Sequence, residues 1–566
     1  MRALMALLLF VFLLALAKRP SYAFQTEDDG RRPWIGAVYF YWYEWDYEKR
    51  LGNWMGGVHN TPLYGYYDSR SFKDNYKSLW LASEWGFTDL FLDYWGAPWK
   101  GEGEEPRERT VLRAAEALRQ KGYPIHIAYY QDGTNFEMKD FSKNITEKRD
   151  TYRWLELYAR SPAWCWLNGK PFQMVYARNG IPVTSQDHEG FRIWLRSRYK
   201  DISMLNSSWG TNFGSFDEID MDFNALGYQR AYSIRYQYEL WKREWGKMED
   251  RIREELGLPG LVASLDVGYG PFLGFGFAEY VKAFGGPHSY AGIFGQPFEM
   301  DEERFIQSVL AKRYGGVFFD HLKNCYHDWN IRIPGTAYLP DPFVYHRFWI
   351  GNLMRYSEGV LHMSWNEWWE GSNAEPTMEW GKRFCEENLF YSTIMQLCFD
   401  SIRDWNKDAE VAIVLNDWIF ESGLGDSRDL YEPLKALRKL NVKFDILPSD
   451  DLSPEELGRK RVLIAPSGLC GFGENRHGER ISDLILGWLS ERKDAKLIAT
   501  IGGDIWDGIE GKWIHKKPDG KPQPGGDINL LVDLGKEGDE EILVRGYSGR
   551  EDWGEVETDR GRERMT

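Results

Sequence analysis

Two glutamates that could work as an acid and a base, Glu367 and Glu370, lie three residues apart in a segment crowded with tryptophan. The segment from 364 to 371 reads Ser-Trp-Asn-Glu-Trp-Trp-Glu-Gly. Two carboxyl groups in such an apolar pocket should have different pKa values, so that one stays protonated while the other ionises. Cleavage of a glycosidic bond needs that division, because the leaving oxygen must be protonated while the anomeric carbon is attacked. The spacing and the aromatic setting therefore predict a catalytic pair.

The alternative for this pair is a position on the first turn of a surface helix, where the helix dipole favours acidic side chains. We favour catalysis because several neighbouring features agree with it. Asn366, Trp368 and Trp369 interleave with the two glutamates and are candidates to bind the same substrate.

Eight short runs of β-branched and aromatic residues alternate with amphipathic segments, a pattern typical of parallel βα units. The expected strands are 35–41, 88–94, 124–130, 171–177, 261–267, 290–294, 316–321 and 359–365. Helices are expected between them, for example over 71–85, 107–121, 301–313 and 342–356. The pattern predicts an α/β fold in which a (β/α)8 TIM barrel occupies residues 30–402.

A large insertion is expected between the fourth and fifth strands, over residues 184–259. It contains a long predicted helix, 225–256, whose apolar stripe we expect to pack against the barrel. The stripe consists of Trp241, Trp245, Met248 and Ile252.

After the barrel, residues 408–510 predict a smaller, doubly wound α/β domain. Its expected strands are 411–416, 443–447, 462–466 and 497–501, with helices over 429–440 and 480–492. Residues 511–566 are rich in Gly, Pro and charge, and we expect a tail or an incomplete module there.

Further candidate substrate-binding residues follow the predicted strands, because barrel enzymes place their chemistry at the carboxyl ends of the strands. These candidates are His59, Tyr67, Asp68, Asp93, Trp95, Trp99, Asp132, Asp320, His321 and Trp329. The acid- and imidazole-rich run from Asp320 to Asp328 matches no known metal-ligand spacing, so hydrogen bonding to substrate or helix capping is the preferred interpretation. We expect neither a metal nor a cofactor.

Composition narrows the choice of partner. The chain has 566 residues, 43% hydrophobic and 28% charged, with 70 Lys+Arg against 86 Asp+Glu and a formal charge of −16. Such an acidic chain repels phosphate backbones, which argues against a nucleic-acid partner. The 27 Trp, 32 Tyr and 31 Phe residues suit a site that stacks against the C–H faces of sugars, so an oligosaccharide or polysaccharide is the expected substrate.

The first 23 residues predict an export signal. Arg2 precedes an apolar run over 3–17, which has the length of a signal-peptide core and is short for a membrane span. Ser21 and Ala23 are small residues in the positions that signal cleavage requires. We therefore expect an exported, extracellular protein, or a cell-surface protein if the apolar run is an uncleaved anchor.

Three segments resemble the family 99 glycoside hydrolases, which include the endo-α-mannosidases. The segment at 364–371, followed by Glu375-Pro376, is similar to the family signature S-[FW]-N-E-W-x-E-G-x-x-x-E-P. His59 with residues 62–69 resembles the loop after the family's first strand, and 86–96 resembles its second strand. The likeness spans roughly residues 35–400 and is dense around strands one, two and eight.

The resemblance implies that Glu370 is the general acid/base and that Glu367 is a base that engages the substrate 2-hydroxyl. It also implies net retention through a 1,2-anhydro sugar. The residues alone establish two carboxylates and assign neither role. At the third strand the chain has Ala-Tyr-Tyr-Gln-Asp over 128–132, where the family has a Glu-Pro-Tyr-like element. This departure bears on mannose specificity.

Other segments resemble the family 42 β-galactosidases. Residues 191–199 and 205–213 are similar to a segment of those enzymes, and 411–503 resembles the amidotransferase-like domain that follows their barrel. Cys470 superficially matches a nucleophile loop, but Phe472 stands where a glycine is expected. A structural or oligomerisation role is therefore preferred to thiol chemistry, and a homo-oligomer could form through this domain.

The leading interpretation is an exported glycoside hydrolase that cleaves an α-linked glycan or polysaccharide. A second is a β-galactosidase-like hydrolase with its carboxylates on separate strands. Enzymes of that clan have an Asn-Glu pair after strand four, whereas residues 175–180 contain no glutamate. A third is a non-catalytic barrel whose aromatic mouth binds carbohydrate without cleaving it.

Overall fold

A computed structural model describes the arrangement of most of the chain. It covers residues 32–94, 106–133, 147–148, 150–177, 187–266, 287–288, 301–327, 337–338, 341–406, 408–423, 430–466, 472–502 and short strands between 506 and 564. The predicted export signal and the predicted strand at 290–294 lie outside these residues. Contacts divide the chain into two units. The first comprises Met1–Pro182, Arg243–Gly270 and Val281–Asp404.

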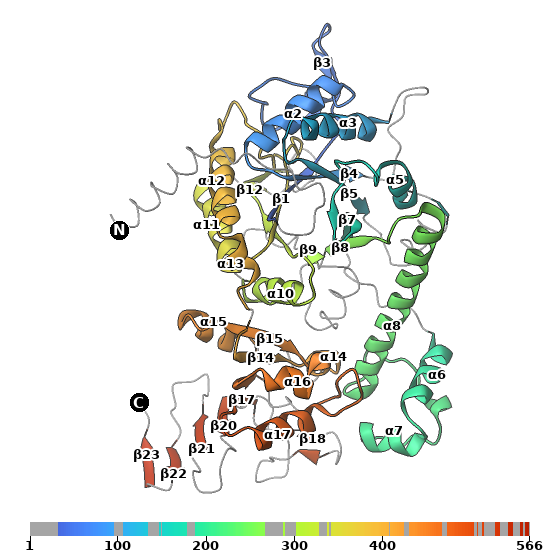
Figure 1. Cartoon of the computed structure of the whole chain (residues 1–566), viewed down its shortest axis with the longest axis vertical. Helices are drawn as coiled ribbons and strands as arrows, with labels where there is room; N and C mark the ends of the chain where they lie inside the picture. The colour runs from blue at the N-terminus through green and yellow to red at the C-terminus, as the bar shows by residue number, and fades with distance from the viewer. Residues whose placement is uncertain are drawn as a thin grey trace. The chain divides into compact units, whose positions relative to one another are not determined.

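Eight parallel strands form the core of the first unit (Figure 1). Each strand pairs in parallel with the next along the chain, and the last, β13, pairs with β1 and closes the ring. This TIM-barrel-like fold agrees with the sequence prediction. The strands are β1 (Trp34–Tyr39), β4 (Asp89–Tyr94), β5 (His126–Gly133), β7 (Lys170–Ala177), β8 (Val262–Asp266), β9 (Pro287–His288), β10 (Phe319–Leu322) and β13 (Gly359–His362).

Helices of the first unit begin where the sequence supplies capping residues. The Ser71 side chain accepts a hydrogen bond from the Asp74 N–H at the start of α2 (Phe72–Glu84). Asp341 caps α11 (Pro342–Met354), which has a proline in its first turn. The other helices are α3 (Arg107–Gln120), α5 (Asp150–Tyr158), α10 (Asp301–Arg313), α12 (Arg383–Leu397) and α13 (Phe399–Arg403). No helix among the described residues has both the length and the apolar character needed to cross a bilayer.

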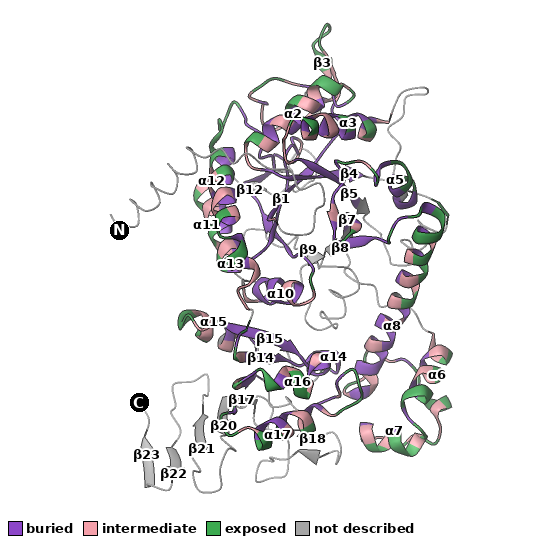
Figure 2. Cartoon of the chain, in the orientation of Figure 1, coloured by how far each residue is buried: buried purple, intermediate pink, exposed green. Residues whose placement is uncertain are grey.

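Aromatic side chains from four strands pack together as the barrel core. The ring centroids of Trp34 and Phe172 are 5.2 Å apart, those of Phe172 and Phe319 are 5.4 Å apart, and those of Phe91 and Phe319 are 5.8 Å apart. Successive side chains of a strand point to opposite faces. Tyr39 accordingly faces the helices, where its hydroxyl donates to Asn75 Oδ1. Strands β1 and β4 are buried along their whole lengths and are purple in Figure 2.

The insertion between β7 and β8 is helical, as predicted, but it divides between the two units. It contains α6 (His188–Arg198), α7 (Ile202–Trp209) and α8 (Tyr228–Arg251). Residues 183–242 belong to the second unit and those from Arg243 to the first. Three members of the predicted stripe, Trp245, Met248 and Ile252, lie in the first-unit part and are buried, whereas the Trp241 side chain lies outside the described part of the chain. In the first-unit part, Lys170 of β7 forms an ion pair of 2.6 Å with Glu249.

The second unit contains a six-stranded sheet in the order β15-β14-β16-β17-β20-β21. The strands β15, β14, β16 and β17 pair in parallel. Next to β17, β20 pairs antiparallel with it, and β21 pairs antiparallel with β20. These strands are β14 (Val411–Leu415), β15 (Phe444–Pro448), β16 (Val462–Ala465), β17 (Lys496–Gly502), β20 (Asp527–Val532) and β21 (Ile542–Gly546). Helices α14 (Asp417–Glu421), α15 (Tyr431–Lys439), α16 (Pro454–Gly458) and α17 (Ile481–Glu491) alternate with the parallel strands.

Within the second unit, arginines of α8 form ion pairs and hydrogen bonds with the domain that contains the sheet. Arg235 forms ion pairs of 2.6 Å with Glu421 and 2.9 Å with Asp450, and its guanidinium lies 3.7 Å from the Trp418 ring centroid. Arg230 Nη1 donates to the Phe420 carbonyl at 2.9 Å. Residues 187–242 and 408–502 therefore share contacts that the sequence pattern did not predict.

Candidate active site

The predicted catalytic pair lies in a loop at the carboxyl end of β13. The next helix, α12, begins only at Arg383, so Glu367 and Glu370 do not stand on the first turn of a helix. The loop begins with a cis peptide bond between Met363 and Ser364. Its first contacts are with the end of β1, where the Trp365 N–H donates to the Val38 carbonyl at 2.8 Å.

Asn366 fixes the loop to the chain that leaves β1. Its Oδ1 accepts a hydrogen bond from the Phe40 N–H at 2.7 Å, and its Nδ2 donates to the Phe40 carbonyl at 2.8 Å. The Tyr43 hydroxyl donates to the Asn366 carbonyl and accepts from the Trp368 N–H, both at 2.9 Å. Asn366 and Trp368 are fully buried. Both predicted binding residues therefore act in this structure as supports of the loop.

The second half of the loop is held by the segment from His59 to Leu63. The His59 N–H donates to the Trp368 carbonyl at 3.1 Å, and the Leu63 N–H donates to the Pro376 carbonyl at 2.8 Å. A β-bridge joins Pro62 to Thr377. His59, a predicted binding residue, is thus placed beside the glutamate loop and is only half-buried.

Glu367 is 4% exposed, and the loop backbone contacts one of its oxygens. Oε1 accepts hydrogen bonds from the Trp369 N–H at 3.0 Å and the Glu370 N–H at 3.3 Å. Among the described residues Oε2 accepts no hydrogen bond. Burial, followed by the negative charge of Glu370, raises the pKa of Glu367 well above its usual range. Glu370 is half-buried and more accessible.

Aromatic rings surround the glutamate loop. Tyr43 and Trp54 stack with centroids 4.2 Å apart, and Trp54 lies 5.9 Å from Trp368. These rings belong to a buried cluster, against which several partly buried aromatic side chains pack: Trp42, Trp45, Tyr66 and Trp369. Of these partly buried rings, Trp369 is among the predicted substrate-binding residues, whereas Trp42, Trp45 and Tyr66 are not.

Glu375, from the same loop, is a buried acid. It belongs to the segment that resembles the family signature, but it was not predicted as a site residue. The Tyr67 hydroxyl donates to its Oε2 at 2.9 Å. Burial raises the pKa of Glu375 to about 8, against the smaller opposing effect of the Tyr67 hydrogen bond. Tyr67, a predicted binding residue, is 8% exposed and forms part of this support. Their separation of 308 positions explains why a single sequence did not reveal the pair.

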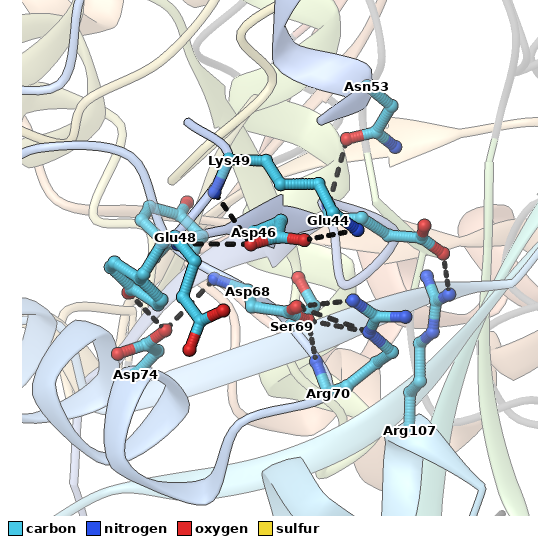
Figure 3. Close-up of polar contacts among 12 residues, drawn as sticks. Glu44, Asp46, Glu48, Lys49, Asn53, Asp68, Ser69, Arg70, Asp74 and Arg107 are labelled. Atoms are coloured by element: carbon cyan, nitrogen blue, oxygen red, sulfur yellow. Dashed lines mark hydrogen bonds and ion pairs between the residues drawn. The ribbon is translucent and has the colours of Figure 1, made fainter. Parts of the chain in front are cut away.

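Charged residues between β1 and the start of α3 form ion pairs, which Figure 3 draws as dashed lines. Arg70 pairs with Asp68 at 2.6 Å, and Arg107, the first residue of α3, pairs with Glu44. Asp68 was predicted to bind substrate, yet here its carboxylate is engaged by Arg70. Glu44 keeps a side chain that is 41% exposed.

Other predicted binding residues lie on the barrel strands β10 and β4. Asp320 is fully buried and pairs with Arg355 at 2.6 Å and Arg304 at 3.7 Å, contributed by the helical layer. Its contacts indicate a structural ion pair. His321 is buried with its ring 6.3 Å from that of Phe348 in α11. Asp93 lies buried near the end of β4.

Four predicted binding residues fall outside the described part of the chain. These are Trp95, Trp99 and Trp329, together with the side chain of Asp132 at the end of β5. Within the described part, no three His, Cys, Asp or Glu side chains gather in a way that could hold a metal ion.

No family model matches the chain. Among curated proteins, the β-galactosidases BgaB of Geobacillus kaustophilus and of Geobacillus sp. (strain Y412MC61) are each 24% identical to it, over 301 and 302 residues. Each match covers 49% of this chain and 43% of the relative, so the chain spans less than half the length of these relatives.

Solved structures of β-galactosidases share the fold. The enzyme of Rahnella sp. R3 superposes with a TM-score of 0.56 at 12% identity, covering 84% of this chain and 72% of its own. The enzyme of Halorubrum lacusprofundi gives 0.52 at 15% identity, covering 81% and 71%. The chain has a glycoside-hydrolase-like fold. A family 99 endo-α-mannosidase from Bacteroides thetaiotaomicron covers 65% of this chain and 98% of its own at 13% identity, but its TM-score of 0.43 is too low to indicate that family.

Proposed function

We propose that this protein is a glycoside hydrolase in which Glu367 and Glu370 form the acid/base pair that cleaves an O-glycosidic bond. The observation that supports the proposal most is the setting of Glu367. It is buried among aromatic rings at the carboxyl end of a barrel strand, its pKa is raised, and a second, more accessible carboxyl group lies three residues away. Barrel enzymes keep their catalytic groups at this end of the strands.

The division of labour between the two glutamates follows from their environments. A raised pKa favours the protonated form of Glu367, and a proton donor is what the leaving oxygen requires. The resemblance to family 99 instead assigns the acid/base role to Glu370. A series of aryl glycosides distinguishes the two. The variant that lacks the acid regains rate as the leaving group improves, whereas the variant that lacks the base or nucleophile stays slow throughout.

For the substrate we propose an α-linked glycan or polysaccharide, because both carboxyl groups come from one loop, as in the family 99 signature. A β-galactoside is the second candidate, since the curated relatives and the better-superposing structures are β-galactosidases. A non-catalytic carbohydrate-binding barrel is the third.

A panel of α-mannosidic and β-galactosidic oligosaccharides and of mixed polysaccharides tests these candidates. The purified full chain is incubated with each, and products are separated by chromatography. Glu367→Gln, Glu370→Gln and, as a matched control on the surface of α12, Glu386→Gln are run in parallel. Cleavage by the wild type and the control but not by the two site variants supports the proposal. Carbohydrate binding without cleavage by any form would support the binding barrel instead.

We also propose that residues 1–23 direct export. Fractionation of expressing cells, with amino-terminal sequencing of any extracellular protein, tests this. A mature chain that begins near Phe24 outside the cell supports it, and full-length protein confined to the cytoplasm contradicts it.

A further inference from the structure

Tyr67 joins three parts of the glutamate loop through one oxygen atom. Its hydroxyl oxygen accepts hydrogen bonds from Asn366 Nδ2 at 2.9 Å and from Trp368 Nε1 at 3.2 Å. The same hydroxyl donates its proton to Glu375 Oε2 at 2.9 Å. Asn366 precedes Glu367 and Trp368 follows it. Two of the three bonds therefore hold the residues on either side of the proposed catalytic residue.

The ring of Tyr67 is itself fixed. Trp54 Nε1 donates to the Tyr67 carbonyl at 2.9 Å, and the rings of Trp54 and Tyr67 meet edge-on with centroids 4.8 Å apart. Tyr67 and Glu375 are 8% and 4% exposed, which leaves water little access to replace a lost hydrogen bond. The ring of Tyr67 is therefore fixed by contacts with Trp54 in addition to its hydrogen bonds with the loop.

We propose that Tyr67 and Glu375 are positioning residues whose hydrogen bond holds the loop carrying Glu367 and Glu370 in its working geometry. This inference rests on the proposed function. Neither residue is proposed to touch the scissile bond. Their effect would reach the reaction through the placement of the Glu367 carboxyl group, for which displacements of an ångström are costly.

Ionisation of Glu375 would disturb this support through the buried charge and not through loss of the Tyr67 hydrogen bond, which a carboxylate accepts more strongly than a carboxylic acid does. Its surroundings supply mainly neutral groups, because the residues that face it are phenols, an indole, a thiol and one lysine: Tyr39, Tyr43, Tyr67, Trp368, Cys385 and Lys77. An ionised Glu375 would place a poorly compensated charge among buried rings. Since its pKa is about 8, the arrangement should be intact at pH 6 and disturbed above pH 8.

Three variants test the pair on whichever glycoside the wild type cleaves. Glu375→Gln keeps the shape of the neutral acid and an oxygen that can accept from Tyr67, and we expect a kcat and a KM close to those of the wild type at pH 6. Glu375→Ala and Tyr67→Phe remove the bond, and we expect kcat to fall about 10- to 100-fold with little change in KM. Tyr64→Phe, on the exposed part of the same segment, is the matched control and should behave as the wild type.

The pH profile separates positioning from simple packing. Glu375→Gln cannot ionise, so above pH 8 it should retain a larger fraction of its pH 6 activity than the wild type does. Parallel loss in the two proteins, or wild-type kcat in Tyr67→Phe, would overturn the proposal. The Gln variant preserves this test if the other two fail to fold. Glu367→Gln in the same assay reports separately on the proposed function: if it is active, that function fails, whatever the pair does.

Discussion

The buried Asp89, at the amino-terminal end of the barrel, is held differently from the buried acids of the glutamate loop. At the amino-terminal end, Asp89 opens β4 and is fully enclosed, with two hydrogen bonds from Arg32 at 2.7 and 2.8 Å. Although burial alone would raise the pKa of Asp89, Arg32 lowers it below its usual value. At the carboxyl end, Glu367 and Glu375 are equally enclosed, but no arginine pairs with them among the described residues, and both pKa values are raised.

This difference distinguishes a structural acid from a chemical one. A buried carboxylate paired with an arginine keeps its charge and resists protonation, so it can join elements but cannot donate a proton. A buried carboxyl group without such a partner keeps its proton near neutral pH and can supply it. The contrast matches the general division of TIM barrels into a stabilising end and a reactive end.

The largest expected effect is on catalysis at the carboxyl end. Replacing Glu367 or Glu370 with glutamine should lower kcat by about 10²–10⁴-fold, the usual contribution of a general acid or base. The free energy of unfolding should hardly change, because glutamine has the shape of a protonated glutamate. Steady-state rates and denaturant titrations of the same preparations measure both quantities. Near-normal turnover in either variant would refute the assignment.

At the amino-terminal end we expect the opposite result, a loss of stability with little change in kcat. Asp89→Asn leaves Arg32 without its carboxylate partner and should reduce the free energy of unfolding by about 3–5 kcal/mol. Any folded protein should turn over at the wild-type rate, since Asp89 begins a strand at the far end from the glutamate loop. A stability close to that of the wild type would show that the ion pair is not what holds this end.

The pH dependence of stability gives an effect of similar size, spread over several pH units. The pKa of Glu375 rises from an ordinary 4.5 to about 8 on folding, so between these values the folded state binds more protons than the unfolded state. The contribution of neutral Glu375 to the free energy of unfolding is therefore complete below pH 4.5. As the pH rises from 4.5 to 8, the free energy of unfolding falls by up to about 1.4 kcal/mol per pH unit. Urea titrations of the wild type and Glu375→Gln should diverge, with the wild type losing more stability between pH 5 and pH 8. Parallel curves would contradict the assignment.

The smallest effect is expected at an exposed ion pair on α12. Arg383 lies 3.6 Å from Glu387, and its side chain is 64% exposed. Arg383→Ala should change the free energy of unfolding by less than about 1 kcal/mol, because solvent screens such pairs. The same denaturation assay provides the measurement, and it sets the scale against which Asp89→Asn is judged. A loss as large as that of Asp89→Asn would remove the distinction between buried and exposed pairs.

Much of the barrel could be predicted from sequence because its strands are short apolar runs separated by amphipathic helices. The expected run 171–177 became β7, and 301–313 became α10 without change. The sixth strand stays a prediction over 290–294, because that range lies outside the described residues; the described β9 is Pro287–His288.

The site was predictable only in part. Glu367 and Glu370 stood out because their spacing and aromatic neighbours are local properties of the chain. The roles of Asn366, Trp368 and Tyr67 were not local. Each is predicted to bind substrate, which stays a prediction, and in the structure each makes hydrogen bonds across a separation of about 300 residues. Likewise, the ion pair between Asp320 and Arg355 could not be predicted before the position of the helical layer was known.

Isotope-edited infrared spectroscopy tests most directly whether the buried glutamates of this loop carry a proton at neutral pH. Protein with labelled glutamate carboxyl groups should show the carbonyl band of a protonated acid at pH 7, and that band should weaken in Glu367→Gln and in Glu375→Gln but not in the surface variant Glu386→Gln. A spectrum with only ionised carboxylate bands at pH 7 would contradict the account.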